Sequence, residues 1–240
     1  MTYIFLVAGK GTRLHPLTLN YPKTLFRLDN NDTILQRMVK SIRAADPGAE
    51  IVVVTGFKHR TIEQSVSGVT YVYNPFYEVT NSIASLWFAR QYMDRDQITI
   101  LNGDIVTSIA LIKDILCVPV EEPSVLYDSS MRQNGDYNVQ IRDGQIIVMS
   151  KEISEYDGEY AGITKLPRRA SRELLAEMDE MIEDGQYMQW YENSLVQMIF
   201  KQNYIVKGID VSAYKWTEVD SVDDMALAKE ICQIDRASQS

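Results

Sequence analysis

The sequence has little cysteine, little histidine and no long hydrophobic run. Its two cysteines, Cys117 and Cys232, each lie in an apolar segment, which favours buried, reduced thiols. No apolar run approaches the ~20 residues that a membrane-spanning helix needs. The amino terminus has neither the basic region nor the apolar core of a secretory signal, so we expect a cytoplasmic protein without a membrane partner.

Positive charge is also scarce. The 240 residues include 24 Lys and Arg against 33 Asp and Glu, which gives a net charge of −9. This balance argues against nucleic acid or an anionic membrane as a partner. Any phosphate that binds must therefore meet local positive groups or a metal ion. The apolar share of 45% and the charged share of 24% are otherwise ordinary for a soluble globular protein.

A glycine-containing loop lies near the amino terminus. The apolar run Tyr3–Val7 is typical of a buried strand, and the Gly-Lys-Gly after it lets the backbone turn and approach a ligand closely. N–H groups in such a turn can face phosphate oxygens, and Arg13 and Lys23 add positive charge. Leu14 stands where a dinucleotide fingerprint needs its third glycine, and the Gly-Lys-Ser/Thr of a Walker loop is absent. A strand-to-loop turn without a ligand is the alternative interpretation.

Apolar runs alternate with amphipathic segments through the first half of the chain. Further strands are predicted over Glu50–Thr55, Thr70–Tyr73 and Ile98–Leu101, and helices over Thr33–Arg43, His59–Val66 and Ser82–Met93. This alternation predicts parallel βαβ units with helices on both faces of the sheet. Ligands of such sheets bind beyond the carboxyl ends of the strands, where the glycine loop already lies.

The second half of the chain has a different pattern. Asp143-Gly144 separates the runs Tyr137–Arg142 and Gln145–Ser150, which predicts a hairpin and a small antiparallel insertion. The remaining elements are predicted strands over Glu159–Ile163 and Tyr204–Val211 and helices over Ser171–Glu183, Trp190–Gln202 and Asp223–Ile234. A capping box at Ser221–Asp224 begins the last helix. The predicted fold class is therefore α/β, with a mixed, mostly parallel sheet.

The full string Leu6–Pro16, followed by Pro22-Lys23, resembles the signature of the nucleotidylyltransferases that join an NTP to a sugar phosphate or a small alcohol phosphate. The resemblance implies a Rossmann-like nucleotidyltransferase fold, in which the loop wraps the triphosphate and Arg13 and Lys23 hold its phosphates as catalytic residues. It implies nucleotide contacts from Val7, Ala8, Gly9, Gly11, Thr12, Arg13, Asn81, Ser82 and Gly103. We expect a single domain over residues 1–240, with a nucleotide-binding half at about 1–119, an acceptor lobe at about 120–205 and a closing strand and helix at 206–234.

Two aspartates are the candidate metal ligands. Asp104 follows the predicted strand Ile98–Leu101, and Asp220 stands just before the last predicted helix. The family places a Mg²⁺-binding aspartate at each of these positions, and Mg²⁺ takes one or two carboxylates plus phosphate oxygens. For Asp104, a turn aspartate without chemistry is the alternative. No general base is required because the acceptor phosphate is already anionic, and neither His15 nor His59 is given a role.

The segment Thr80–Trp87 narrows the range of acceptor substrates that the resemblance implies. Many sugar-phosphate members have Gly-Leu/Thr-Ala here, whereas this segment is more similar to the bacterial CTP:phosphocholine cytidylyltransferases and relatives that act on small phosphorylated or phosphonylated amines. This similarity implies CTP as the nucleotide. In those relatives an aromatic and acidic segment receives the cationic head group, and Trp190, Tyr191 and Glu192 occupy the corresponding place, where rings and a carboxylate attract a cation. Ordinary packing of the aromatic pair is the alternative.

Lys151 directly follows the predicted hairpin, at the position where sugar-phosphate members carry a lysine that holds the acceptor phosphate. A solvated surface lysine is the alternative. Three alternative functions agree with these features. The first is a Mg²⁺-dependent cytidylyltransferase that uses CTP and a small phosphorylated amine or amino-acid-like acceptor. The others are a sugar-1-phosphate nucleotidylyltransferase and a non-catalytic nucleotide-binding subunit. The presence of Arg13, Lys23, Asp104 and Asp220 favours an enzyme. The sequence leaves the identity of the acceptor and the oligomeric state open.

Overall fold

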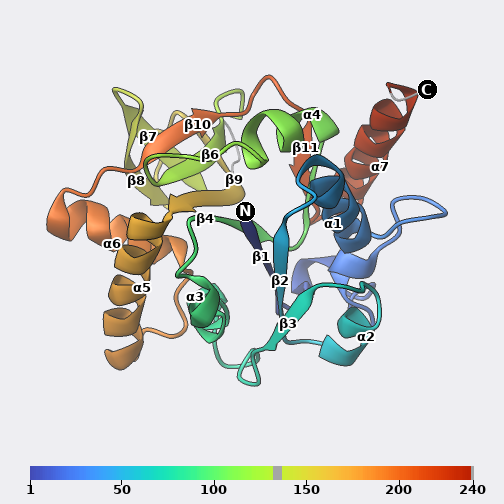
Figure 1. Ribbon diagram of the computed structural model, residues 1–240, viewed down its shortest axis with the longest axis horizontal. Helices are drawn as coiled ribbons and strands as arrows, with labels where there is room; N and C mark the ends of the chain where they lie inside the picture. Colours follow the sequence, from blue (N-terminus) through green and yellow to red (C-terminus); the bar gives the residue numbers. More distant parts are fainter. Residues whose placement is uncertain (132–136, 239–240) are drawn as a thin grey trace.

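Strands and helices alternate along the computed structural model, which describes residues 1–131 and 137–238 (Figure 1). The strands are β1 (Thr2–Val7), β2 (Glu50–Thr55), β3 (Thr70–Tyr73), β4 (Gln97–Asn102), β5 (Ile105–Thr107), β6 (Ser124–Asp128), β7 (Asn138–Arg142), β8 (Gln145–Ser150), β9 (Gly158–Pro167), β10 (Lys207–Asp210) and β11 (Trp216–Glu218). The helices are α1 (Ile34–Ala45), α2 (His59–Glu63), α3 (Ser82–Phe88), α4 (Ile109–Leu111), α5 (Arg168–Glu183), α6 (Glu192–Gln202) and α7 (Val222–Ala237). Short 3₁₀ helices lie at Thr12–Leu14, Lys23–Leu25 and Arg90–Tyr92, and a π-helical turn, Ile112–Leu116, follows α4.

β1 is the centre of a parallel arrangement. It pairs in parallel with β2 and β4, and β2 pairs in parallel with β3. Side chains of β1 alternate between two cores, because Ile4 packs with α3, α5 and α6 whereas Tyr3 and Phe5 pack with α1 and α2. In Figure 1, α5 and α6 lie on the left of the sheet and α1 on the right. The predicted α/β class with helices on both faces is therefore confirmed.

The sheet continues beyond β4 mainly through antiparallel pairs, although β6 and β10 pair in parallel. β9 pairs antiparallel with both β4 and β6, and the full strand order is β3-β2-β1-β4-β9-β6-β10-β8-β7. β7 and β8 form the predicted hairpin, in which Asp143 and Gly144 have φ angles of 52° and 72°, the backbone that a two-residue primed turn requires. The antiparallel part thus extends beyond the predicted hairpin and is continuous with the parallel part.

The carboxyl-terminal elements return to the end of β4. β11 pairs antiparallel with β5, and the Val219 N–H donates to the Asp104 carbonyl at 3.1 Å, so that the residues after β11 lie beside Asp104. The predicted capping box of α7 is confirmed, because the Asp224 N–H donates to Ser221 Oγ and the Ser221 N–H donates to the Asp224 carboxylate. A third, small core lies between β5 and α7.

Several boundaries differ from those predicted. α3 ends at Phe88 rather than at Met93, because Ala89 leaves helical geometry before the 3₁₀ turn Arg90–Tyr92. α6 begins two residues later than predicted, and β10 is shorter than the apolar run that contains it. β5 and β6 were not predicted, since each is short and depends on a partner strand that is distant in sequence, whereas the strand expected just before Asp220 is present as β11.

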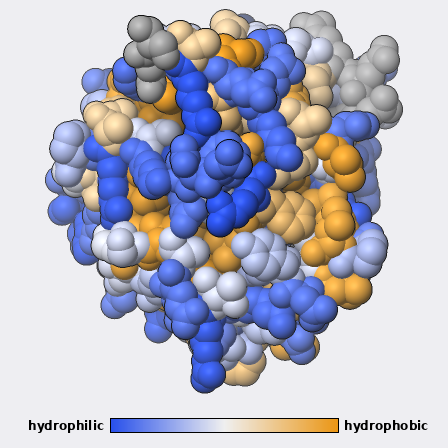
Figure 2. All heavy atoms as spheres, turned by 90° about the vertical axis from the view of Figure 1, so that its right-hand side faces the viewer, coloured by the Kyte–Doolittle hydropathy of each residue, from blue (hydrophilic) through white to orange (hydrophobic). Residues whose placement is uncertain are grey.

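The face that lies on the right of Figure 1, where α1 and α7 are found, is mainly hydrophilic, with smaller apolar patches between the polar side chains (Figure 2). α7 buries Ala228, Ile231 and Cys232 and exposes most of its other side chains. In residues 1–131 and 137–238, no helix has the length and apolar character needed to cross a membrane.

Candidate active site

A cavity of about 360 Å³ lies at the carboxyl ends of β1 and β4. Its wall is formed by the glycine loop, the start of α3, the ends of β4 and β11, and residues around β7, β9 and α6. Most of the predicted site residues line it: Ala8, Gly9, Gly11, Thr12, Arg13, Asn81, Ser82, Asp104, Lys151, Trp190, Glu192 and Asp220. The structure adds Leu6, Tyr77, Thr80, Ser85, Asn102, Tyr137, Tyr160 and Glu218 to the lining.

The glycine loop lies open to this cavity. Gly11 has a left-handed backbone (φ 63°), which glycine adopts without strain, and it begins the turn Thr12–Leu14. Its carbonyl accepts hydrogen bonds from the Leu14 N–H at 3.1 Å and from Thr18 Oγ1 at 2.6 Å, and these two bonds fix the turn. A Cβ added at Gly9 would meet nothing within 4 Å, so the space beside this residue is open. The main chain of the loop can therefore be approached closely by a ligand.

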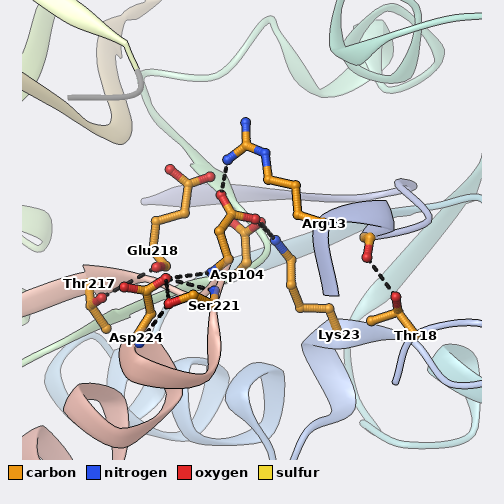
Figure 3. A network of polar contacts seen from close by, with 10 residues as sticks. Arg13, Thr18, Lys23, Asp104, Thr217, Glu218, Ser221 and Asp224 are labelled. Carbon is orange, nitrogen blue, oxygen red and sulfur yellow. Dashed lines mark hydrogen bonds and ion pairs between the residues drawn. The ribbon is translucent and has the colours of Figure 1, made fainter. Parts of the chain in front are cut away.

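Lys23 joins the two candidate metal ligands. Its Nζ lies 2.6 Å from Asp104 Oδ2 and 2.6 Å from Asp220 Oδ1. Arg13 Nη1 donates to Asp220 Oδ2 at 2.5 Å. Figure 3 shows Arg13 and Lys23 reaching toward the carboxylates, with Glu218 on the other side. Burial lowers the pKa of Lys23, but the charges of Asp104 and Asp220 outweigh burial and raise this pKa above its ordinary value, so the ammonium stays charged.

The two carboxylates fit a Mg²⁺ ion that also binds a nucleotide. Asp104 Oδ1 is buried and has no hydrogen-bond partner in the part of the chain that the structure describes, so this hard oxygen is not satisfied by protein groups. Within that same part, no three or more His, Cys, Asp or Glu side chains are grouped to hold a metal. Mg²⁺ does not require such a group, because it commonly takes one or two carboxylates and completes its shell with phosphate oxygens and water.

The start of α3 is hydrogen-bonded to the segment that precedes α6. The Asn81 N–H donates to the Tyr187 carbonyl at 3.0 Å, and the Tyr191 N–H donates to Ser82 Oγ at 3.0 Å. Asn81 Oδ1 accepts the Ser82 N–H at 2.8 Å and caps the helix. The two residues predicted to contact the nucleotide base therefore line the cavity and also hold its opposite wall in place.

One end of the cavity is formed by Tyr137, Lys151, Tyr160, Trp190 and Glu192, called the aromatic end below. The ring centroids of Tyr137 and Trp190 lie 5.1 Å apart, and those of Tyr137 and Tyr160 lie 6.0 Å apart. Lys151 Nζ lies 4.1 Å from the centroid of the Trp190 ring, within the range of a cation–π contact. Glu192 is only 5% exposed, and burial raises its pKa to about 7. This end thus combines one cation and one carboxylate with apolar walls.

Tyr191 does not line the cavity, which corrects the prediction that it contacts an acceptor. Its side chain is fully buried, and its hydroxyl is hydrogen-bonded to the Tyr160 hydroxyl at 2.7 Å and to Thr164 Oγ1 at 3.1 Å. Its neighbours Trp190 and Glu192 line the cavity, whereas the ring between them packs in the core of the α5 and α6 side. Tyr191 therefore supports the wall rather than forming its surface.

Three other predicted residues lie behind the cavity wall. The Gly103 N–H donates to the Leu6 carbonyl at 2.9 Å, and a Cβ at Gly103 would lie 2.1 Å from Val7 Cγ1. The close approach of two strands explains this glycine, which corrects its predicted contact with the nucleotide. The Val7 side chain packs in the core of the α1 side. Lys23 does not line the cavity, but it contacts Asp104 and Asp220, which do.

The sequence-based prediction missed Tyr137, Tyr160 and Glu218. Tyr160 stands in a predicted strand and Tyr137 at the start of another, but it is the pairing of β7 with β9 that brings their rings together. Glu218 precedes Asp220 by two residues at the end of β11. Alternate residues of an extended chain lie on the same face, so this spacing was a signal that could have identified Glu218.

Comparisons with known proteins find similar chains. Residues 3–197 match the family described as the MobA-like NTP transferase domain. The chain is similar to the CTP:phosphoglutamine cytidylyltransferase of Campylobacter jejuni, with 22% identity across 94% of this chain and 98% of that protein. It is also similar to the choline-phosphate cytidylyltransferase of Streptococcus pneumoniae, with 23% identity across 96% of this chain and 98% of that protein.

Solved structures share the fold. The CTP:phosphocholine cytidylyltransferase from Streptococcus pneumoniae gives a TM-score of 0.75 at 19% identity, with 96% of this chain and 98% of that chain covered. A putative glucose-1-phosphate thymidylyltransferase from Bacillus anthracis gives 0.78 at 17% identity, with 97% and 96% covered. These likenesses confirm the predicted nucleotidyltransferase fold, and they include enzymes named for different acceptors.

Proposed function

The chain belongs to the MobA-like NTP transferase domain family, and on this premise we propose that it is a Mg²⁺-dependent cytidylyltransferase. It transfers CMP from CTP to a small phosphorylated or phosphonylated amine, or to an amino-acid-like acceptor, and it releases pyrophosphate. The observation that carries the proposal is a single cavity that joins the glycine loop, Asp104 and Asp220 to the aromatic end. Relatives named as cytidylyltransferases of phosphoglutamine and of choline phosphate support CTP and this class of acceptor.

The proposed reaction brings two anions together. An acceptor phosphate oxygen attacks the α-phosphorus of CTP, a new P–O bond forms, and the bond to the pyrophosphate oxygen breaks. Positive charge and fixed positioning are the main requirements, because the reactants repel each other. The loop after β1 supplies backbone N–H groups for the phosphates, and Arg13 supplies charge. No side chain needs to accept a proton, since the acceptor phosphate is already anionic near neutral pH.

Asp104 and Asp220 are the residues that would hold Mg²⁺. When bound, the ion neutralises phosphate charge and polarises the phosphate oxygens. Lys23 contacts both carboxylates and holds them close to each other despite their like charge. Its permanently charged ammonium also strengthens the positive side of the site. The two carboxylates, Lys23 and Arg13 thus form one network for the triphosphate.

The aromatic end receives the acceptor. Glu192 attracts the cationic amine, and the rings of Tyr137 and Trp190 give apolar contact. Lys151 supplies charge for the anionic part of the acceptor, because an ammonium above a ring still has N–H groups that can donate. The opposite charges of Lys151 and Glu192 match an acceptor that carries both a phosphate and an amine.

A sugar-1-phosphate nucleotidylyltransferase is the second candidate. The likeness to the putative glucose-1-phosphate thymidylyltransferase, at a TM-score of 0.78, favours it. A hexose offers hydroxyl groups and no cation, so it would leave the buried Glu192 without a charged partner. Because of this mismatch, we rank the sugar-1-phosphate nucleotidylyltransferase below the cytidylyltransferase.

The test follows pyrophosphate release from each of the four NTPs with a panel of phosphorylated acceptors. We expect release to be fastest with CTP and an amine phosphate, and to stop when a chelator removes divalent cations. The Asp104→Asn variant serves as the control for contaminating activity. Faster turnover of a hexose phosphate would support the second candidate. Nucleotide binding without any pyrophosphate release would instead support a non-catalytic subunit.

A further inference from the structure

The Trp190 ring, which was expected to receive a cationic head group, already has a cation above it. Lys151 Nζ lies 4.1 Å from the ring centroid. The Tyr137 ring packs against the same indole with the centroids 5.1 Å apart and the planes tilted by 55°. A ligand cation attracted to this ring would have to come within about 6 Å of its centroid. It would then meet the like charge of Lys151.

The two tyrosine rings of the aromatic end are also fixed in place. The Tyr160 hydroxyl is bonded to the hydroxyls of Tyr191 and Thr164, at 2.7 Å and 2.9 Å. The Tyr137 hydroxyl donates to Asn193 Oδ1 at 3.0 Å. Both rings are at least nine-tenths buried, at 8% exposure for Tyr137 and 4% for Tyr160. Their hydrogen bonds and their burial hold them in these positions, so they are not free to rearrange around a trimethylated cation.

Glu192 is the group at this end that suits a cation. Its side chain lines the cavity although the residue is only 5% exposed. A buried carboxylate is costly unless charged hydrogen-bond donors pair with it. A primary ammonium has three N–H donors that can satisfy carboxylate oxygens, whereas a quaternary ammonium has none. The buried position of Glu192 therefore favours the primary amine.

We propose that the acceptor is the phosphate or phosphonate of a short primary amine, held through its N–H groups by Glu192, and that Lys151 excludes quaternary ammonium groups from the Trp190 ring. This inference rests on the proposed cytidylyltransferase function and narrows its acceptor class. Lys151 acts as a specificity-determining residue, since its ammonium occupies the position that a trimethylated head group would take.

The test compares phosphoethanolamine with phosphocholine as acceptors for CTP, measured as kcat/KM for each. The wild-type enzyme is expected to prefer phosphoethanolamine by about tenfold or more, the size of effect that one cation–π or charged hydrogen-bond contact gives. In Lys151→Ala both rates fall because a phosphate contact is lost, but the ratio moves toward phosphocholine by about tenfold. Lys151→Arg keeps a cation over the ring and is expected to keep the wild-type ratio.

Two further comparisons make the test decisive. Glu192→Gln should reduce the preference for phosphoethanolamine over its N-acetyl derivative, in which the nitrogen is uncharged but the phosphate is retained. Lys229→Ala, on the exposed side of α7, is the control and should leave every one of these kcat/KM ratios unchanged. A wild-type preference for phosphocholine, or an unchanged ratio in Lys151→Ala, overturns this inference while CTP turnover still supports the proposed function. If neither amine is turned over with CTP, the proposed function itself fails in its acceptor class.

Discussion

The ammonium of Lys23 lies 2.6 Å from the Asp104 carboxylate, behind the wall of the cavity. The same nitrogen is 2.6 Å from Asp220, so two acidic side chains that are far apart in the sequence share one cation. Without that cation their like charges would disfavour close approach. Lys23 is therefore a positioning residue for the proposed metal ligands, besides any contact that it makes with phosphate.

The first prediction concerns this pair of carboxylates. Asp104→Asn and Asp220→Asn should each lower kcat about 100-fold or more, because each removes a charge that is fixed in place for the reaction. Circular dichroism should show that both variants fold, since Lys23 keeps one partner in each. Asp223→Asn, three residues beyond Asp220 in the exposed first turn of α7, is the matched control and should retain activity. Full activity in both Asn variants would remove the metal assignment.

The second prediction separates two basic residues of the glycine loop. Arg13 lines the cavity and bonds to Asp220, whereas Lys10 does not line it and pairs with Glu78 at 2.8 Å. Arg13→Ala should raise the KM for the nucleotide about tenfold, the size of a charged hydrogen bond. Lys10→Ala should leave it within about twofold, because an exposed ion pair contributes little. Equal effects in initial-rate kinetics would show that the loop does not discriminate between these side chains.

Local signals predicted the parts of the fold that depend on neighbouring residues. The run Tyr3–Val7 is apolar on both faces because β1 is buried on both faces, and Asp143-Gly144 determined the β7–β8 turn through its positive φ angles. Such features need no distant partner. The loop after β1 was identified in the same way, from glycines at the end of a buried strand.

Contacts between residues that are distant in the sequence could not be predicted from the sequence. Lys23 and Asp220 are 197 residues apart, and nothing local indicates that a lysine joins the two aspartates. The segment Trp190–Glu192 lies beside the cavity, as expected, but its three side chains do not share one environment. Trp190 and Glu192 line the cavity, whereas Tyr191 is in the core, and the backbone of the turn before α6 determines this difference. Tyr191 lies in the core, where its hydroxyl is hydrogen-bonded to the hydroxyl of Tyr160 on β9, and this contact between two separate elements has no local signal in the sequence.

The third prediction compares two glycines that were both expected to contact the nucleotide. Gly103→Ala should destabilise the fold by about 1–3 kcal/mol or more, because its Cβ would lie 2.1 Å from Val7 Cγ1 and 2.8 Å from the Leu6 carbonyl. Gly9→Ala should leave the midpoint of urea unfolding nearly unchanged, since no atom lies within 4 Å of its Cβ. It should nevertheless weaken nucleotide binding, measured by titration calorimetry, because the methyl group enters the open side of the loop. Normal nucleotide affinity in Gly9→Ala would contradict the close approach of phosphate there.

The last prediction concerns Glu192 and pH. Burial raises its pKa from the ordinary value of 4.5 to about 7. Between these two values the folded protein keeps a proton on Glu192 that the unfolded chain has released, so this residue makes stability fall as pH rises. The full cost is present above pH 7 and amounts to about 3 kcal/mol for a shift of this size.

The variant Glu192→Gln has no carboxyl group to ionise at this position, so its free energy of unfolding should not fall with rising pH for this reason. Urea unfolding at about pH 5 and about pH 8 should therefore show the variant gaining stability relative to the wild type by about 2–3 kcal/mol between the two conditions. Glu152→Gln, on the exposed surface after β8, is the matched control and should follow the wild type at both pH values. A Glu192→Gln difference that is the same at both pH values would show that the carboxylate is ionised with little cost when buried, and that the aromatic end already satisfies it without an acceptor.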